Sequence, residues 1–410
     1  MTTRVMLMGH QRNESDDLSL NIQADTQDMM KLPPLGLYIH IPWCVRKCPY
    51  CDFNSHKAEG SFNEVDYVNA LLLDLDREQP FIDDRPIETV FLGGGTPSLF
   101  SGEAIDAILS GFRSRLNLSK DAEITLEANP GTAEQKKFEA FRSAGINRLS
   151  LGVQSFQTLK LQRLGRIHGQ EEALEALRLA KKVGFEAINL DLMFGLPDQT
   201  LEDALMDVET AIGLSPTHIS YYQLTLEPNT VFHKYPPRLP GEERTWAIQE
   251  AAQELLAESG YGHYEVSAYA KMGRQCRHNV SIWEFGDYLG IGAGAHGKIS
   301  FPEEGVVVRT TKIRHPQHYV DAAQEGKSLG SRATIETKDL PFEFLMNALR
   351  LRSGFSRGLF EARTGLSMEV LEPTLRDLKE EGLLEKSREE IRCTSSGFNF
   401  LDTILQRFLP

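Results

Sequence analysis

The feature that most constrains the fold is a repeated alternation of short apolar runs and amphipathic stretches between residue 36 and about residue 225. Apolar runs bounded by turn residues are typical of buried strands, and apolar residues spaced three or four apart indicate helices. We expect strands at Leu37–Ile41, Thr89–Leu92, Glu123–Glu127, Arg148–Val153, Ala187–Met193 and His218–Leu224. We expect helices at Val65–Arg77, Ala104–Leu116, Ala133–Ala144, Glu171–Val183 and Leu201–Ile212.

This alternation predicts an α/β fold with a parallel sheet, because each helix returns the chain to the start of the next strand. Six strand–helix units are too few to close an eight-stranded barrel. An open, partial (β/α)6 barrel is therefore predicted, with any site at the carboxyl ends of its strands.

Three of the five cysteines, Cys44, Cys48 and Cys51, follow the first expected strand with the spacing C-x3-C-x2-C. The low, odd cysteine count and the lack of a secretory signal favour a reducing compartment over disulfides. Three thiolates can hold a [4Fe–4S] cluster that normally takes four, which leaves one iron open to another ligand. A structural zinc ion, with His40 or His56 as fourth ligand, fits the cysteines alone equally well.

Further polar and glycine residues follow the other expected strands. The run Gly93–Pro97 reads Gly-Gly-Gly-Thr-Pro, and Glu127, Gln154 and Asp191 stand at or near later strand ends. Singly, each has an ordinary explanation as a turn, a helix cap or a solvent-facing side chain. Together at one rim they favour a binding site, in which the glycines let backbone N–H groups approach an anionic ligand.

The cysteine spacing, Tyr50 beside the last cysteine and the glycine run together resemble the radical S-adenosylmethionine (radical SAM) enzymes. The resemblance implies a [4Fe–4S] cluster held by Cys44, Cys48 and Cys51. It also implies S-adenosylmethionine bound at the open iron, which the cluster cleaves reductively to a 5′-deoxyadenosyl radical. Such chemistry belongs to the cofactor, while the protein orients the groups and excludes water.

Residues from about 35 to 400 resemble the oxygen-independent coproporphyrinogen III oxidase family, and its heme-chaperone branch most of all. The motifs that carry this include Tyr38–Trp43, Cys51–His56, Phe91–Ser98, Leu126–Gly131, Leu151–Phe156, Leu164–His168, Asn189–Pro197 and Tyr222–Asn229. Position by position, the resemblance implies S-adenosylmethionine contacts at Tyr38, Tyr50, Gly94, Gly95, Thr96, Glu127, Gln154, Arg166 and Asp191. Glu127 and Asp191 can accept hydrogen bonds from the methionine amine or the ribose hydroxyls, and Arg166 can pair with a carboxylate.

Two positions separate the branches of that family. The oxidase branch carries a further cysteine where this chain has Phe53, which neither ligates metal nor relays a hydrogen atom. The chaperone branch carries His-Asn-x-x-Tyr-Trp, and this chain reads His278-Asn-Val-Ser-Ile-Trp283, with Ile282 in place of the tyrosine. His278 is therefore the candidate axial heme ligand. The alternative is a loop histidine hydrogen-bonded to backbone.

The resemblance thus implies a heme chaperone that binds heme, a [4Fe–4S] cluster and S-adenosylmethionine, and passes heme to acceptors such as respiratory hemoproteins. It also implies a reductant for the cluster. The alternative enzyme is an oxygen-independent coproporphyrinogen III oxidase, acting by radical oxidative decarboxylation, which Phe53 disfavours. A zinc-stabilised binding module without redox chemistry is the third hypothesis.

Charge and hydropathy limit the partners and the location. A formal net charge of −14 and a pI near 5.4 argue against general nucleic-acid binding, which needs a basic surface. Runs of about 18 apolar residues are absent, so we expect no transmembrane helix, although peripheral membrane association remains compatible. A cytoplasmic location is expected.

Four regions are expected along the chain. They are a flexible arm over residues 1–34, the radical-SAM-type partial barrel over 35–230, a barrel extension with the heme-site motif over 231–325, and a C-terminal domain over 326–410. The last region is expected to be mainly helical and winged-helix-like. Its elements are helices at Phe342–Leu351, Ser356–Thr364 and Val370–Glu381, a β pair at Leu383–Lys386 and Ile391–Thr394, and a final helix ending at Phe408.

Overall fold

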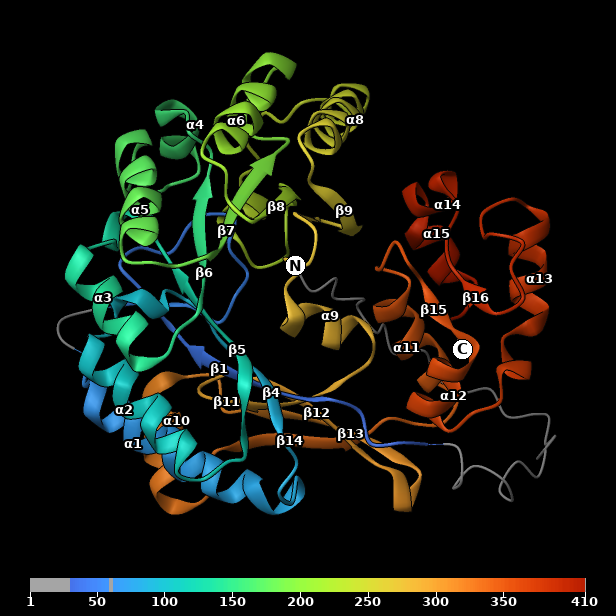
Figure 1. The fold of residues 1–410 in the computed structure, drawn as a ribbon, viewed down its shortest axis with the longest axis horizontal. Helices are drawn as coiled ribbons and strands as arrows, with labels where there is room; N and C mark the ends of the chain where they lie inside the picture. Colours follow the sequence, from blue (N-terminus) through green and yellow to red (C-terminus); the bar gives the residue numbers. More distant parts are fainter. Residues whose placement is uncertain (1–29, 59–61, 410) are drawn as a thin grey trace.

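The computed structural model describes residues 30–58 and 62–409, which form a curved, open sheet with helices on its outer side and a helical C-terminal region (Figure 1). The predicted arm lies outside the described residues up to position 29. Twelve strands form the main sheet in the order β14-β13-β12-β11-β1-β4-β5-β6-β7-β8-β10-β9. β14 (Leu329–Thr334) and β9 (Gly262–Glu265) are its edges, so this part of the chain forms an open barrel.

All six predicted strands are present and pair in parallel. They are β1 (Leu35–Ile41), β4 (Ile87–Gly94), β5 (Leu118–Ala128), β6 (Arg148–Gln154), β7 (Ala187–Phe194) and β8 (His218–Gln223). The five predicted helices between them are also present. They are α1 (Glu64–Glu78), α2 (Gly102–Arg113), α3 (Gln135–Ala144), α5 (Gln170–Lys182) and α6 (Leu201–Gly213). A further short helix between β6 and α5, α4 (Thr158–Arg163), was not predicted.

Strands from the expected extension lengthen the same sheet at both ends. β11 (Asp287–Ile291) pairs in parallel with the free side of β1, and β12 (His296–Phe301) and β13 (Val306–Lys312) follow it antiparallel. At the other end, β10 (Ala268–Ala270) pairs antiparallel with β8. One large cluster of buried apolar side chains fills the space between this sheet and its outer helices.

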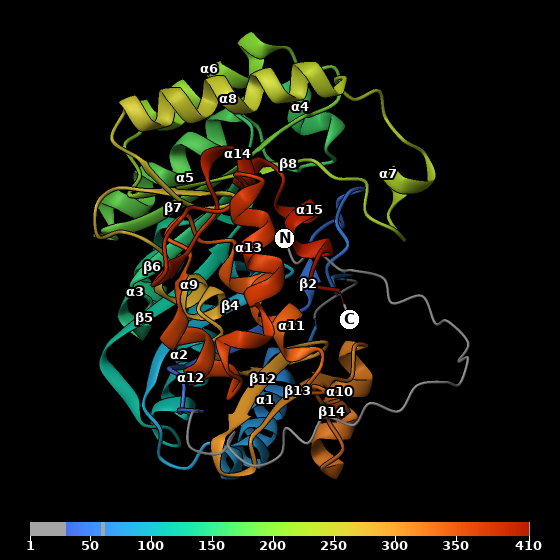
Figure 2. The same cartoon turned by 90° about the vertical axis from the view of Figure 1, so that its right-hand side faces the viewer.

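Helix α9 (Arg277–Trp283) lies on the concave face of the sheet, between the strands and the C-terminal helices (Figures 1 and 2). The remaining helices outside the C-terminal region are α7 (Val231–Lys234), α8 (Glu242–Glu258) and α10 (Pro316–Glu325).

The C-terminal region has its own cluster of buried apolar residues, which includes Phe344, Phe360 and Leu375. Its helices are α11 (Leu340–Ala348), α12 (Arg357–Thr364), α13 (Glu372–Glu380), α14 (Ser395–Asn399) and α15 (Leu401–Gln406). The predicted β pair survives as a single bridge between Leu384 and Cys393. The predicted final helix is wrong in one respect, because it breaks at Phe400 into α14 and α15.

Candidate functional site

The three cysteines lie on a loop that leaves the carboxyl end of β1. Cys44 ends the short strand β2 (Trp43–Cys44), and the loop returns through β3 (His56–Lys57), which pairs with β2. All three thiols are free and half-buried. Burial raises the pKa of the Cys44 and Cys51 thiols, and the nearby Cys48 adds to the rise at both. The pKa of Cys51 is influenced by both Cys44 and Cys48, so the three thiols are neighbours on this loop.

Each thiol also has a polar neighbour supplied by another part of the fold. The Thr96 hydroxyl donates to Cys44 Sγ at 3.5 Å, and Arg166 Nη1 donates to Cys48 Sγ at 3.7 Å. At Cys44 the Thr96 donor works against the rise in pKa that burial causes, and so favours the thiolate, which is the form that binds metal.

The described side chains do not form a preassembled zinc site at these cysteines. Within residues 30–58 and 62–409, no three His, Cys, Asp or Glu side chains converge to hold one metal ion. Zinc needs four donors about 2.0–2.3 Å from a single centre. Of the proposed fourth ligands, His40 has both ring nitrogens engaged, with the Tyr38 hydroxyl and the Asn54 carbonyl, each at 2.9 Å. Cluster ligands bind separate irons and need no such convergence.

The glycine run packs against the cysteine loop, and its backbone N–H groups donate hydrogen bonds to other residues of the protein. Gly94 N–H donates to Glu127 at 3.1 Å, Gly95 N–H to the Ile41 carbonyl at 2.8 Å, and Thr96 N–H to the Trp43 carbonyl at 2.7 Å. The expectation that these N–H groups stay available for an anion is therefore wrong. The close approach that glycine permits is real, because a Cβ on Gly95 would lie 2.6 Å from the Trp43 carbonyl oxygen.

Two carboxylates meet on the concave face behind the cysteine loop. Burial, followed by the charge of Asp191, raises the pKa of Glu127 to about 7. Asp191 accepts hydrogen bonds from the Ser150 hydroxyl at 3.1 Å and from Asn189 Nδ2 at 2.8 Å, and burial raises its pKa. Two buried carboxyls with raised pKa values gain stability from a bound cation, which favours their ionised form.

Gln154 and Arg166 lie together beside Gly152. Gln154 ends β6 with a φ of +69°, a conformation that costs a non-glycine residue energy and often marks a functional site. A Cβ on Gly152 would lie 3.1 Å from Gln154 Nε2 and 3.3 Å from Arg166 Nη2. Arg166 Nη2 donates to the Gly152 carbonyl at 2.6 Å, while its buried Nε has no hydrogen-bond partner in the described chain.

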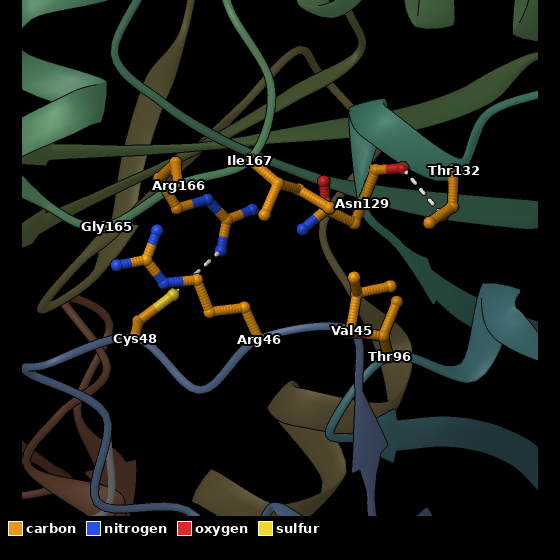
Figure 3. Close-up of a pocket in the computed structure, with 9 residues that line it drawn as sticks. All are labelled: Val45, Arg46, Cys48, Thr96, Asn129, Thr132, Gly165, Arg166 and Ile167. Atoms are coloured by element: carbon orange, nitrogen blue, oxygen red, sulfur yellow. Dashed lines mark hydrogen bonds between the residues drawn. The ribbon is translucent and has the colours of Figure 1, made fainter. Parts of the chain in front are cut away.

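A small pocket opens next to Cys48 between the cysteine loop and the loop that carries Arg166 (Figure 3). Its lining residues are Val45, Arg46, Cys48, Thr96, Asn129, Thr132, Gly165, Arg166 and Ile167. Two guanidinium groups and no carboxylate are present among these described residues, so the pocket favours an anionic group.

The two tyrosines of the predicted site occupy different environments. Tyr38 stacks on Phe91, with ring centroids 6.3 Å apart and planes 25° apart. Tyr50 packs against Phe232 at 6.3 Å, and burial raises the pKa of its phenol. The predicted S-adenosylmethionine residues thus gather at the carboxyl ends of the parallel strands, although their ligand roles stay predictions.

His278 lies in helix α9 and is 3% exposed. Its Nδ1 is 2.8 Å from the Thr89 hydroxyl, and its ring stacks on Phe91 at 5.2 Å with the planes 27° apart. Its buried Nε2 has no partner among the described residues. Burial, helped by the charge of Arg148, lowers the pKa of His278 to about 3, so the ring is neutral. The alternative of a loop histidine bonded to backbone is wrong.

Sequence reasoning missed the residues that hold these groups in place. Asn54 Nδ2 donates to the Ala293 carbonyl at 2.9 Å and to the Arg314 carbonyl at 2.8 Å, which ties the cysteine loop to the glycine-rich segment after β11. Glu123 accepts from the Arg277 and His278 N–H groups at 3.1 and 3.0 Å, which anchors the first turn of α9. Their partners lie far away in sequence, so no local pattern could reveal these contacts.

Phe53 is 45% exposed on the cysteine loop. It offers no ligand atom at the position where the oxidase branch has its further cysteine.

Comparisons with known proteins give relatives over most of the chain. The radical SAM superfamily model matches residues 38–211, and the HemN C-terminal domain model matches residues 335–400. The chain is 52% identical over 381 residues to the heme chaperone HemW of Escherichia coli (strain K12), covering 93% of this chain and 100% of that protein. It is 48% identical to the heme chaperone HemW of Haemophilus influenzae, covering 93% and 99%.

A solved structure shares the fold. Coproporphyrinogen III oxidase (HemN) from Escherichia coli, a radical SAM enzyme, superposes with a TM-score of 0.79 at 22% identity, covering 93% of this chain and 92% of that one. At that identity the likeness concerns the fold alone, and it confirms the predicted α/β architecture with a helical C-terminal region.

Proposed function

We propose that this chain, which belongs to the HemW family of radical SAM proteins, binds heme and transfers it to acceptor proteins. The resemblance inferred from the sequence is thereby confirmed at the level of the family. The heme-chaperone names of the relatives support the function, and the chain covers those relatives almost completely.

The radical SAM superfamily implies a [4Fe–4S] cluster and S-adenosylmethionine as cofactors. The donor set fits them. Cys44, Cys48 and Cys51 would hold the cluster, which supplies one-electron chemistry when bound. Glu127 and Asp191 would bind the cationic amine or the ribose hydroxyls of S-adenosylmethionine, because both carboxylates are buried and close to each other.

The remaining members of the predicted set would complete that pocket. Arg166, with a buried Nε that lacks a partner in the described chain, would pair with the S-adenosylmethionine carboxylate. Gln154 lies beside it. The glycines Gly94 and Gly95 would act by holding Thr96 against Cys44 rather than by donating to the ligand.

The observation that carries the heme proposal is the hydrogen bonding of the His278 ring, in which Nδ1 has a partner and Nε2 has none among the described residues. When Nδ1 carries the ring proton and donates to the Thr89 hydroxyl, Nε2 presents its lone pair. That nitrogen is buried without a partner in the described residues, which costs free energy unless a ligand satisfies it. A neutral imidazole with a free Nε2 is the form that ligates heme iron.

Heme access to His278 requires α9 to move. The ring is almost fully buried between Phe91 and the strands, and Glu123 holds the first turn of the helix. Helix α9 has only seven residues, so the anchoring by Glu123 is a large part of what keeps it in place. We expect heme binding to be slow and to reorder this helix.

The test is a ferric-heme titration of the full chain after anaerobic reconstitution of the cluster, followed through the heme absorption spectrum. His278→Gln is the matched variant, because glutamine can keep a hydrogen bond to Thr89 but ligates iron poorly. We expect at least about a tenfold weaker affinity for this variant. Unchanged affinity would remove His278 from the role, and no binding by the wild-type chain would remove the function.

Two parallel assays separate the proposal from the oxidase alternative. Heme-loaded protein is mixed with an apo-hemoprotein, and transfer is read from the acceptor's spectrum. The same reconstituted chain is given coproporphyrinogen III, S-adenosylmethionine and a reductant without oxygen. We expect heme transfer and no protoporphyrinogen, because Phe53 replaces the additional cysteine of the oxidase branch.

The acceptors proposed are respiratory hemoproteins, and a one-electron reductant for the cluster is a further partner. We place the protein in the cytoplasm, which suits five free cysteines. Within the described residues no helix is long and apolar enough to cross a membrane.

A further inference from the structure

Three histidine rings lie against one another where the cysteine loop meets the start of α10. The centroids of the His56 and His315 rings are 5.6 Å apart, and those of His315 and His318 are 4.4 Å apart. His315 directly precedes α10 without capping it through its side chain, and His318 lies in the first turn of the helix. Both are exposed, and neither ring forms a hydrogen bond with any residue that the structure describes. Their nitrogens are therefore open to an external ligand.

This histidine group is fixed to the cysteine loop. Asn54 donates to the Arg314 carbonyl at 2.8 Å, immediately before His315, and the Asn54 side-chain oxygen is 3.3 Å from His56 Nε2. The candidate heme ligand His278 is elsewhere, buried beneath α9 on the concave face. The two histidine locations are thus separate, one accessible and one enclosed.

The charges around the exposed histidines suit an acidic ligand. The exposed charged residues on the described part of the cysteine loop are Arg46, Lys47, Asp52 and Lys57, which leaves an excess of cations. Arg314 adds another exposed cation beside His315, and the exposed anions of α10 itself, Asp321 and Glu325, lie further along the helix. The whole chain carries a net charge of −14, so this local excess of positive charge is unusual for the molecule.

The geometry favours heme iron over a bare metal ion. A bare ion needs several side chains that converge on it, and the described residues contain no group of three that does so. Heme iron already has four pyrrole nitrogens and needs only one or two axial ligands. Heme also carries two propionates, which match the cations.

We infer that His315 and His318 form a surface docking site for heme, where the cargo is held by an axial histidine before it reaches His278 or after it leaves. The inference rests on the proposed function and names a second place on the molecule for the same cargo. It accounts for how a protein with an enclosed ligand can exchange heme with partners, because the exposed site needs no movement of α9.

The test compares the full, cluster-reconstituted chain with a His315→Ala/His318→Ala variant. Ferric heme is the probe, read by difference spectra and by stopped-flow absorbance. We expect two binding phases in the wild type. In the variant the fast, weaker phase should lose at least about tenfold in affinity, while the slow phase keeps its amplitude. His233→Ala is the matched control, because His233 is also exposed and its Nδ1 bonds the Leu226 carbonyl.

Two further measurements give the test a spectroscopic signature. Iron-free protoporphyrin IX should bind the wild type and the double variant equally, because it has no iron to ligate. A His315→Met variant keeps an iron ligand of another kind and should shift the heme spectrum of the fast phase.

Unchanged fast-phase affinity in the double variant would overturn the inference, as would an equal loss for the iron-free porphyrin or for His233→Ala. Wild-type protein that binds no heme would instead defeat the proposed function itself. The two failures are therefore distinguishable.

Discussion

The cysteine loop and helix α9 hold their functional side chains in opposite ways. The three thiols stand half-buried on a loop, next to a pocket and exposed cations. His278 stands on a helix, 3% exposed, with its ring stacked on Phe91. The contrast shows that the cysteine loop lies half-open beside a pocket, while the His278 side chain is enclosed, so the heme binding proposed there requires α9 to move.

The physical origin of the contrast is the partner each region uses. The cysteine loop is tied by hydrogen bonds from the Asn54 side-chain amide to two backbone carbonyls, which fix its path while its cysteines stay half-buried. In helix α9 the first-turn N–H groups donate to Glu123, and this anchoring keeps the His278 side chain packed against the sheet. The cysteine loop is thus held in a fixed position for its ligand, whereas the candidate ligand His278 is kept buried by the position of α9.

The largest expected effect tests the cysteine region. Cys48→Ser should abolish the cluster, because two remaining thiolates cannot hold it, and bound iron and sulfide should fall to background. Iron and sulfide analysis after anaerobic reconstitution is the measurement. Cys393→Ser serves as the control and should keep full iron, since Cys393 packs against the C-terminal apolar cluster. Retained iron in the first variant would contradict the assignment.

The next effect tests the helix α9 region. Thr89→Val removes the hydroxyl that bonds His278 Nδ1 but keeps the shape of the side chain. Loss of such a supporting partner should weaken heme affinity by about 10- to 100-fold. Heme titration of this variant is compared with Thr89→Ser, which keeps the hydroxyl and should bind as the wild type does. Equal affinity in all three proteins would mean that Thr89 does not orient the ligand.

The pH dependence of S-adenosylmethionine affinity tests the cofactor region alone, because it depends on Glu127 and not on His278. Below a pH of about 7 the Glu127 carboxyl is protonated and uncharged, because burial and Asp191 raise its pKa. Cationic S-adenosylmethionine should therefore bind more tightly as the pH rises, by at most about tenfold per pH unit, and level off above a pH of about 7. Calorimetric titration between pH 5 and about 8 measures this.

The Glu127→Gln variant is the control for the pH effect. It cannot ionise, so this part of the pH dependence should vanish, and its affinity should stay low. Affinity that falls as the pH rises, or an unchanged profile in the variant, would exclude Glu127 from the S-adenosylmethionine site.

The smallest expected effect tests whether α9 must open. Glu123→Gln weakens the charge-assisted hydrogen bonds to the Arg277 and His278 N–H groups by about 1 kcal/mol. If opening limits heme entry, the slow association rate should rise by about fivefold. Stopped-flow absorbance measures the rate, and Glu88→Gln, in the neighbouring strand β4, is the control. A slower rate in Glu123→Gln would show that the anchored helix is needed for entry.

The strand–helix order was predictable because its pattern is local. All six strands from Leu37 to Leu224 were identified within a few residues, since apolar runs and turn residues are read directly from the chain. The break at Phe400 was not predictable, because neither glycine nor proline stands there and the final helix is divided by packing.

The site was only partly predictable, because several of its contacts join residues that are far apart in the sequence. The sequence places Cys44, Glu127 and Asp191 at one rim, because the carboxyl ends of parallel strands lie together. It could not show that Gly94 and Gly95 donate to the protein, since that depends on how two loops meet. Nor could it show the contact of His278 with Thr89, which is 189 positions earlier in the chain.

The bond between Asn54 and Ala293 has a consequence for biogenesis. Those two residues are 239 positions apart, and Gly294, with a φ of +77°, leaves room for the Asn54 amide. During synthesis the cysteine loop leaves the ribosome long before its anchor does. Insertion of the proposed cluster would therefore come late in translation, once β11 and the segment after it have been synthesised and can anchor the loop.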